Sequence, residues 1–167
     1  MALPLLLRSI EASTFSTWLR ESDSPFVFYF VLLFHTFGLS LLVGANGLVD
    51  LCLLGFLRGI PLAPLKRFFR IMWIGFSINV VTGILLIVSY PTKALTNPVF
   101  YAKLAMIGCA VWVMTKLQRV FADSTATETD MMARGATLAR LSLGLWIGTL
   151  AAGRLLAYTF KYILYPV

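Results

Sequence analysis

One uninterrupted apolar run constrains this chain more than any other feature. It extends from Phe26 to Leu57, 32 residues that contain no proline and only two acidic or basic side chains, His35 and Asp50. A bilayer core about 30 Å thick requires roughly 20 apolar residues at about 1.5 Å of helical rise each, so this run is long enough to cross a membrane. Ionisable side chains inside a span are energetically unfavourable and usually face a partner, which makes His35 and Asp50 the first candidates for function.

The composition of the whole chain agrees with an integral membrane protein. Of its 167 residues, 59% are hydrophobic and 13% are charged, and the mean hydropathy is +0.87, well outside the range of soluble domains. The formal charge is +7, and with so few charges in total this excess indicates membrane orientation rather than nucleic-acid binding. Cys52 and Cys109 both fall in apolar segments, so we expect no disulfide.

Four apolar segments predict an all-α bundle of four membrane-spanning helices within residues 25–167. Asn97 and Pro98 have the residue types of an N-cap and a first helical position, and Ser22 to Pro25 offer the same signals before the first span. The polar segment 122–135 predicts a flexible connection. The expected spans are residues 26–57, 68–90, 98–121 and 136–165.

Residues 1–24 predict a separate amphipathic helix that lies in the membrane interface. Arg8 and Glu11 interrupt its apolar patch early, so the segment does not have the pattern of a signal peptide. An ordinary surface helix is the alternative. The apolar stripe on which the prediction depends consists of Leu7, Ile10, Phe15, Trp18 and Leu19.

The distribution of basic residues predicts the orientation in the membrane. Eight of the fourteen Lys and Arg residues flank the first-to-second and third-to-fourth connections. The positive-inside rule therefore places these connections in the cytoplasm and both termini on the outer side of the membrane. The eight residues are Arg58, Lys66, Arg67, Arg70, Lys116, Arg119, Arg134 and Arg140.

This orientation allows the depth of polar side chains to be calculated from the helical rise. His35 follows Phe26 by nine residues, which places it roughly 13 Å below the outer boundary of the membrane. Arg154 is expected at a similar depth in the last span, and Lys103 is expected above both, near the outer surface. The outer half of the bundle would therefore contain one imidazole and two cations.

Small and polar residues gather on one face of several spans. His35, Gly38, Asn46 and Asp50 share such a face of the first span, and Gly144 and Gly148 have GxxxG spacing in the last. Small residues allow helices to approach closely in lipid, so these faces are also what the packing seams of an ordinary bundle would contain.

Several short motifs resemble a family of small bacterial four-span membrane proteins known as a domain of unknown function. The motifs are HTFGLSLLVG, VDLCLLG, TGILL, NPVFYAK and the late W-x6-GR-x3-Y, which here contains Trp146, Gly153, Arg154 and Tyr158. The resemblance covers about residues 25–160 and implies the four-span fold and a place in a bacterial inner membrane, with both termini in the periplasm. It transfers no activity. The pattern of that family has an arginine where this chain has Cys52, so Asp50 is expected to pair with Arg70 or Arg140 instead.

The sharpest functional hypothesis is a b-type haem held by His35 as the metal ligand. A neutral imidazole is a good axial ligand, and Arg154 and Lys103 stand where cations for the haem propionates would be needed. Gly38, one turn from His35, would make room for the porphyrin face, and Tyr158 completes the set of candidate site residues. The second axial ligand would be Met72, Met106 or Met114, a side chain of a partner, or none.

Other interpretations of the same residues remain open. His35 would equally form a hydrogen bond to a carbonyl, serine or threonine of a neighbouring helix, and Cu(I) bound by His35 with Met and Cys is a further alternative. Asp50 and Arg70 predict a structural ion pair at the inner boundary. A proton path is also conceivable along the bundle, through Asp50, Asn46, His35 and Tyr158.

The chain lacks the motifs of an enzyme that acts alone: it has no nucleophile with a base, no phosphate loop, no HExxH and no CxxC. We therefore weigh a membrane subunit of a bacterial electron-transfer complex, with a quinone or periplasmic redox protein as partner. The alternative is a cofactor-free accessory or assembly subunit that docks into a larger complex or a homo-oligomer. A small transporter is third, because four unbroken spans leave little room for alternating access.

Overall fold

The fold is built from four long helices. The computed structural model describes residues 2–21, 26–57, 59–123 and 125–163, and within these residues it is helical without any strand. Each long helix is apolar enough, over enough residues, to cross a membrane, which confirms the predicted all-α fold with four candidate spans. These helices are α3 (Phe26–Leu53), α4 (Phe68–Ser89), α6 (Pro98–Ala122) and α7 (Glu128–Ile163).

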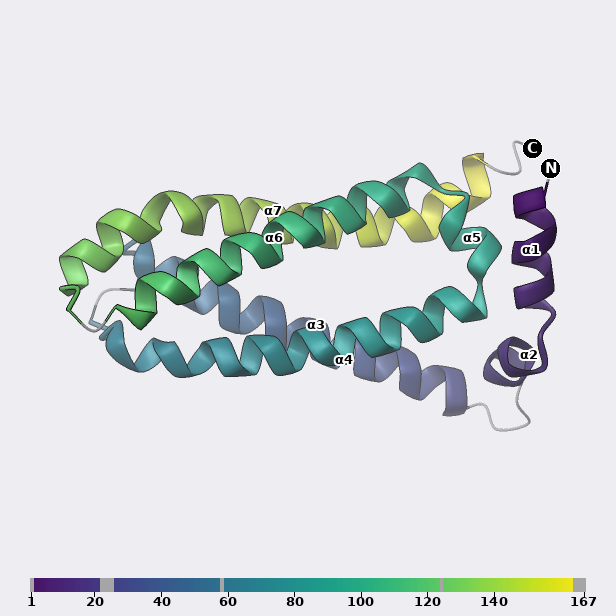
Figure 1. The fold of residues 1–167 in the computed structure, drawn as a ribbon, viewed down its shortest axis with the longest axis horizontal. Coiled ribbons are helices and arrows are strands. Elements are labelled where there is room, and N and C mark those ends of the chain that lie inside the picture. Colours follow the sequence, from purple (N-terminus) through teal and green to yellow (C-terminus); the bar gives the residue numbers. More distant parts are fainter. Residues whose placement is uncertain (1, 22–25, 58, 124, 164–167) are drawn as a thin grey trace.

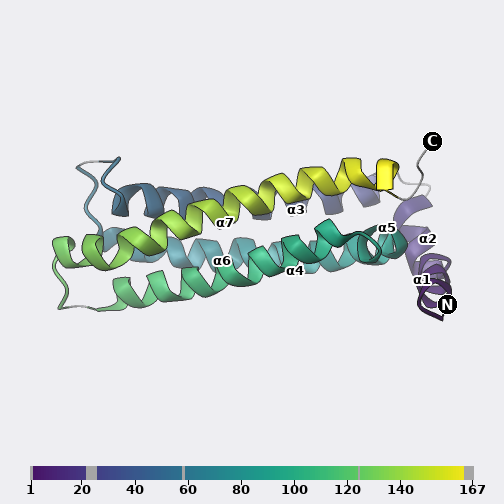
Figure 2. The ribbon, with the colours of Figure 1, turned by 90° about the horizontal axis from the view of Figure 1, so that it is seen from above.

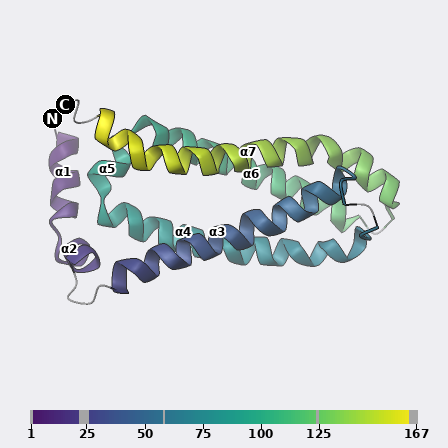
Figure 3. The same ribbon diagram turned by 180° about the vertical axis from the view of Figure 1, so that it is seen from behind.

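The long helices form two antiparallel hairpins, α3/α4 and α6/α7 (Figure 1). Helices pack more extensively within a hairpin than between hairpins, and the hairpins touch each other mainly through α3 and α7. We call the end that carries the α3–α4 and α6–α7 connections the loop end, and the opposite end the terminal end. The ribbons of the two hairpins separate toward the terminal end (Figures 1 and 3), and Figure 2 shows α7 beside α3.

The hydrophobic core is concentrated in the loop half of the bundle. There Leu42 and Val49 of α3, Met72 of α4, and Met114 and Leu117 of α6 have at most 2% of their surface exposed. The same cluster continues to Phe69, Phe121 and Trp146. The two hairpins are therefore held together by apolar packing near the loops and much less near the termini.

Helices α3 and α4 approach each other closely where they cross at Gly38 and Gly75. A Cβ atom added to Gly75 would lie 2.7 Å from the carbonyl oxygen of Gly38 and 2.8 Å from the amide nitrogen of Leu42. A Cβ atom added to Gly38 would lie 2.7 Å from Asn79 Nδ2. Only glycine fits at this crossing, as expected for helices that pack through small residues in lipid.

The first span ends at Leu53, four residues before the predicted Leu57, because Gly55 reverses the chain with a φ of 75°. The amide nitrogen of Gly55 donates to the carbonyl of Cys52, and that of Phe56 donates to the carbonyl of Leu51, each at 3.0 Å. This pair of bonds is a Schellman motif, which satisfies the last carbonyls of a helix.

The last helix begins at Glu128, eight residues before the predicted start, so half of the segment expected to be flexible is helical. Thr127 and Asp130 form a capping box: the backbone N–H of Asp130 donates to Thr127 Oγ1 at 3.3 Å, and the backbone N–H of Thr127 donates to the Asp130 carboxylate at 3.2 Å.

In the preceding loop, hydrogen bonds from the Thr125 hydroxyl and N–H, and then from Arg134, lower the pKa of Asp123. These contacts are fully present above the ordinary pKa of an aspartate and are lost as the pH falls through the lowered pKa.

The start of α6 confirms the predicted cap. Asn97 accepts a hydrogen bond from the backbone N–H of Val99 at 3.0 Å, and Pro98 occupies the first turn. Asn97 also donates to Thr159 of α7 at 2.9 Å, which ties the two helices of this hairpin at the terminal end. The connection before it contains a short helix, α5 (Pro91–Leu95). The corresponding cap expected at Ser22 to Pro25 lies outside the described residues.

The N-terminal segment forms two helices, α1 (Ala2–Glu11) and α2 (Thr14–Glu21), where the sequence predicted one. Both lie across the terminal end of the bundle (Figure 1). Ser16 donates to the carbonyl of Val88 at 2.9 Å, and Arg20 donates to the carbonyl of Ser89 at 3.1 Å. The predicted apolar stripe is divided: Leu7 and Leu19 are buried, whereas Ile10, Phe15 and Trp18 are exposed.

Replacing glycine by alanine should change the stability of the fold in opposite directions at two positions of the α3/α4 hairpin, Gly75 and Gly44. Gly75→Ala forces a methyl group against backbone atoms of α3 and should destabilise the fold by about 1–3 kcal/mol. Gly44→Ala, on the same crossing hairpin but with nothing within 4 Å of an added Cβ, should stabilise it by up to about 1 kcal/mol through helix propensity. Reversible unfolding in mixed micelles measures both, and equal stability of the two variants would contradict the close approach.

Candidate functional site

Two polar clusters lie inside the bundle, and the one nearer the terminal end contains the single histidine of the chain. His35 of α3 is half-buried, and its Nδ1 lies 2.8 Å from Oγ1 of Thr82 on α4. A hydrogen bond from His35 to a threonine of a neighbouring helix was one of the alternatives considered for this residue. The bond joins two helices whose residues are 47 positions apart in sequence.

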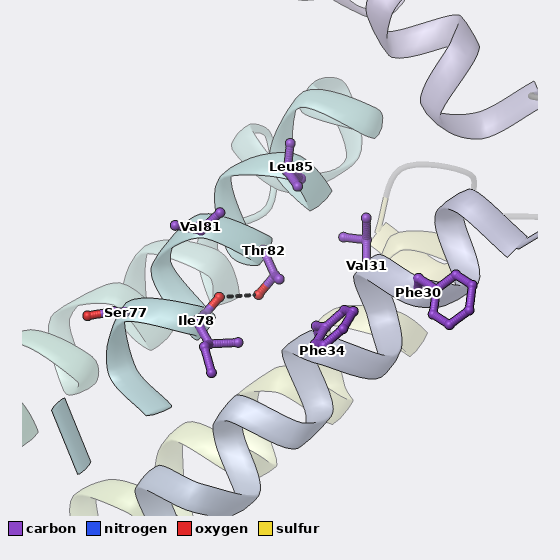
Figure 4. Close-up of a pocket in the computed structure, with 8 residues that line it drawn as sticks. All are labelled: Phe30, Val31, Phe34, Ser77, Ile78, Val81, Thr82 and Leu85. Atoms are coloured by element: carbon purple, nitrogen blue, oxygen red, sulfur yellow. Dashed lines mark hydrogen bonds between the residues drawn. The ribbon is translucent and has the colours of Figure 1, made fainter. Parts of the chain in front are cut away.

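The environment of Thr82 determines which atom donates in this bond. The hydroxyl of Thr82 points its single hydrogen at the carbonyl of Ile78, 2.7 Å away (Figure 4). Because a hydroxyl has only one hydrogen, Thr82 must accept from His35, and the proton of the neutral imidazole is then on Nδ1. The other ring nitrogen, Nε2, keeps its lone pair free, and no partner for it is found among the described residues.

Lys103 of α6 is a cation near this imidazole. The Nζ of Lys103 would lie 3.6 Å from a Cβ atom added to Gly153 on α7. Lys103 is therefore level with Gly153 and its neighbour Arg154, not above them as the depth calculation predicted. Its half-buried side chain lies beside Gly153, within the α6/α7 hairpin.

Three further predicted site residues lie elsewhere. The space beside Gly38 is occupied by Gly75 and Asn79 of α4, so it has no room for the face of a porphyrin. Arg154 and Tyr158 are both exposed on the outside of α7, Tyr158 to 65%. One residue along a helix turns the side chain by about 100°, which directs Arg154 away from the side that Gly153 presents to Lys103.

The second cluster, nearer the loop end, contains Asp50, and the predicted ion pair with Arg70 is wrong. Asp50 is completely buried, whereas Arg70 is exposed on α4 and forms no ion pair with it. Instead, the amide of Asn46 donates to the Asp50 carboxylate at 2.5 Å and to Ser142 Oγ on α7 at 2.6 Å. Arg140, the other expected partner, is also exposed.

Sequence reasoning missed the polar residues of α7 that face this cluster. Ser142, Trp146 and Thr149 recur one turn apart, and each has at most 2% of its surface exposed. Their spacing of four and three residues inside an apolar helix was a readable signal of one polar face. Trp146 Nε1 and Thr149 Oγ1 have no hydrogen-bond partner among the described residues.

An apolar groove lies on the side of the α3/α4 hairpin (Figure 4). Its volume is about 420 Å³, and Ser77 and Thr82 supply its only hydroxyl groups. Both hydroxyls donate to carbonyls of α4, so the groove offers mainly apolar surface to its surroundings. It is lined by Phe30, Val31, Phe34, Ser77, Ile78, Val81, Thr82 and Leu85.

Comparison with known proteins adds no family to these observations. No protein-family model matches the chain, and neither a curated protein nor a solved structure is significantly similar to it. The resemblance to a family of unknown function therefore stays a prediction. Among the described residues, no three His, Cys, Asp or Glu side chains gather to hold a metal ion.

The hydrogen bond between His35 and Thr82 predicts a single imidazole tautomer. Thr82→Val removes the acceptor while keeping the volume of the side chain, so the two neutral tautomers of His35 should become comparable in population. Thr82→Ser should retain the wild-type tautomer, and Thr36→Val, on the outer surface of α3, is the matched control. Nitrogen-15 NMR of the only histidine measures this directly, and an unchanged spectrum in Thr82→Val would refute the bond.

Proposed function

We propose that the chain is a membrane subunit of a bacterial redox complex and that His35 is the axial ligand of a b-type haem. The observation that carries this proposal is the imidazole itself, which is fixed through Nδ1 by Thr82 and keeps Nε2 free. Histidines that ligate metals typically donate their second nitrogen to such a neighbouring acceptor, which orients the ring. When bound, the haem would supply one-electron transfer.

The surroundings of His35 restrict how such a group would be held. Because α4 fills the space at Gly38, the group would approach from the side of the α6/α7 hairpin. Lys103 is the cation available there for a propionate. It takes the role that Arg154 was expected to share.

None of the three methionines considered as a second ligand is placed beside His35. Met72 and Met114 are fully buried in the loop half of the bundle, and the sulfur of Met106 packs on Gly148 of α7. We therefore propose that the second axial position is open or is filled by another subunit. This favours a place for the chain inside a larger assembly, with a quinone or a periplasmic redox protein as the electron partner.

In this proposal the chain lies in the inner membrane with its terminal end toward the periplasm. The basic side chains Lys66, Arg67 and Arg70 are exposed at the loop end, as are Arg134 and Arg140 of α7. A cluster of exposed cations at one end supports the cytoplasmic assignment of that end. The exposed aromatic residues Phe15 and Trp18 at the other end suit the interface of a membrane.

The haem proposal predicts an absorption spectrum that depends on one residue. Protein purified after expression with added haem precursor should show a Soret band, and His35→Ala should abolish it. Thr82→Val should retain the band but lower haem affinity by about 10–100-fold, the usual effect of losing a neighbour that orients a ligand. No Soret band, or a band that survives His35→Ala, would rule the proposal out.

A second candidate function is a cofactor-free docking subunit, and exposed glycines favour it. Gly44, Gly108 and Gly144 are exposed on three different spans, and a Cβ atom added to any of them would meet nothing within 4 Å. Glycines that serve no contact within the bundle permit close contact with helices of another subunit or a second copy.

Docking through these glycines predicts a loss of assembly without a loss of fold. Gly44→Leu and Gly144→Leu should each shift the protein from a larger species to a smaller one in native gels of detergent-extracted membranes. Val81→Leu is the control, because Val81 is 60% exposed on α4 but is already large. Wild-type protein that migrates as a lone monomer would eliminate this candidate.

A further inference from the structure

The buried cluster around Asp50 has an unusual combination of charge and environment. Asp50, Asn46 and Ser142 have at most 1% of their surface exposed, and they lie where α3 packs against α7 inside the bundle. Asp50 Oδ1 and Asn46 Oδ1 have no hydrogen-bond partner among the described residues. An ionised carboxylate at such a site is strongly unfavourable unless a cation or several donors compensate it.

Among the described residues, no cationic side chain compensates Asp50 from the helices packed around it. Lys116 of α6 lies over the ring of Trp112, 5.2 Å from its centroid, and Arg134 pairs with Asp123 at 3.1 Å. On its own helix, the nearest titratable side chain is the buried thiol of Cys52. The other described basic residues near the loop end are exposed: Lys66, Arg67, Arg70, Arg119 and Arg140.

A proton is the compensating charge that fits this cluster. Asp50 Oδ2 accepts from the Asn46 amide at 2.5 Å, but Oδ1 has no donor among the described residues. A carboxyl group with a proton on Oδ1 is neutral, so it can stay buried without a cation. The Asn46 amide, which also donates to Ser142 Oγ at 2.6 Å, keeps its bond to Oδ2 in that state.

We propose that Asp50, Asn46 and Ser142 form a proton-binding site within the membrane, which exchanges its proton through the terminal half of the bundle. This site is about 22 Å of helix from His35, the rise of fifteen residues. The proposal is independent of any group bound at His35.

The surroundings of the cluster differ on its two sides. Toward the loop end, Leu53, Leu65, Phe69 and Phe121 close it with side chains that are at most 4% exposed. Toward the terminal end, α7 presents polar atoms one after another. Trp146 Nε1 and Thr149 Oγ1, both buried and without a partner among the described residues, would bond to water molecules that carry the proton.

Infrared spectroscopy of the full-length protein in liposomes tests the proton site. At neutral pH a protonated Asp50 should give a carboxylic C=O band that shifts in heavy water, and Asp50→Asn should remove this band. Asp123→Asn, which alters an exposed carboxylate, is the matched control and should leave the band in place. A band present in both variants would belong to another group and would overturn the assignment.

A different result would identify a different ion. If Asp50 is ionised across the neutral range and its carboxylate bands shift on adding sodium chloride but not choline chloride, the site binds sodium and the proton proposal is wrong. Carboxylate bands that respond to neither salt nor pH overturn ion binding of either kind. Circular dichroism of Asp50→Asn establishes that the lost band does not reflect unfolding.

The direction of proton exchange has its own test. Thr149→Val and Trp146→Phe remove the unpaired polar atoms and should slow the deuterium shift of the Asp50 band several-fold. Thr36→Val, at a lipid-facing position of α3, should leave the rate unchanged. If both α7 variants exchange at the wild-type rate while Leu53→Ala exchanges faster, the proton enters from the loop end and the proposed direction is wrong.

Discussion

The contact between α3 and α7 holds this molecule together, because the two hairpins touch each other mainly along it. In lipid, helices gain no hydrophobic driving force from associating, so close packing and hydrogen bonds between helices must supply the cohesion. The α3–α7 contact combines both: an apolar core in the loop half and the bond from Asn46 to Ser142 within it. The polar cluster at Asp50 is therefore part of the joint between the hairpins as well as a candidate site.

The fold was readable from the sequence because the membrane imposes a simple length and composition on each span. The helix ends were less readable, since they depend on local bonds that hydropathy does not report. Gly55 ends α3 through its positive φ, and Thr127 with Asp130 begins α7 eight residues early. Both signals were present in the sequence: Gly55 follows the first apolar run, and Thr127 and Asp130 have the spacing of a capping box within a polar segment.

In the candidate site, the spacing of residues in the sequence predicts their level along a helix but not which neighbouring helix their side chains face. Helical rise predicts the level of a residue along its span, but only tertiary packing decides that Lys103 lies beside Gly153 and that Arg154 is exposed. The same limit explains Asp50, which the sequence paired with a cation at the nearest basic boundary. Its true partners, Asn46 and Ser142, depend on which face of α7 meets α3.

The docking of the first two helices has a consequence for the order in which the protein assembles. Ser16 and Arg20 bond to carbonyls at the end of α4, and Thr92 donates to Glu11, across 69 to 81 residues of sequence. Because α1 and α2 precede α3 and α4 in the chain, they can dock only after both of these later helices have formed. Helices α1 and α2 therefore dock only on a completed α3/α4 hairpin, so their docking can be used as a sign that this hairpin has formed.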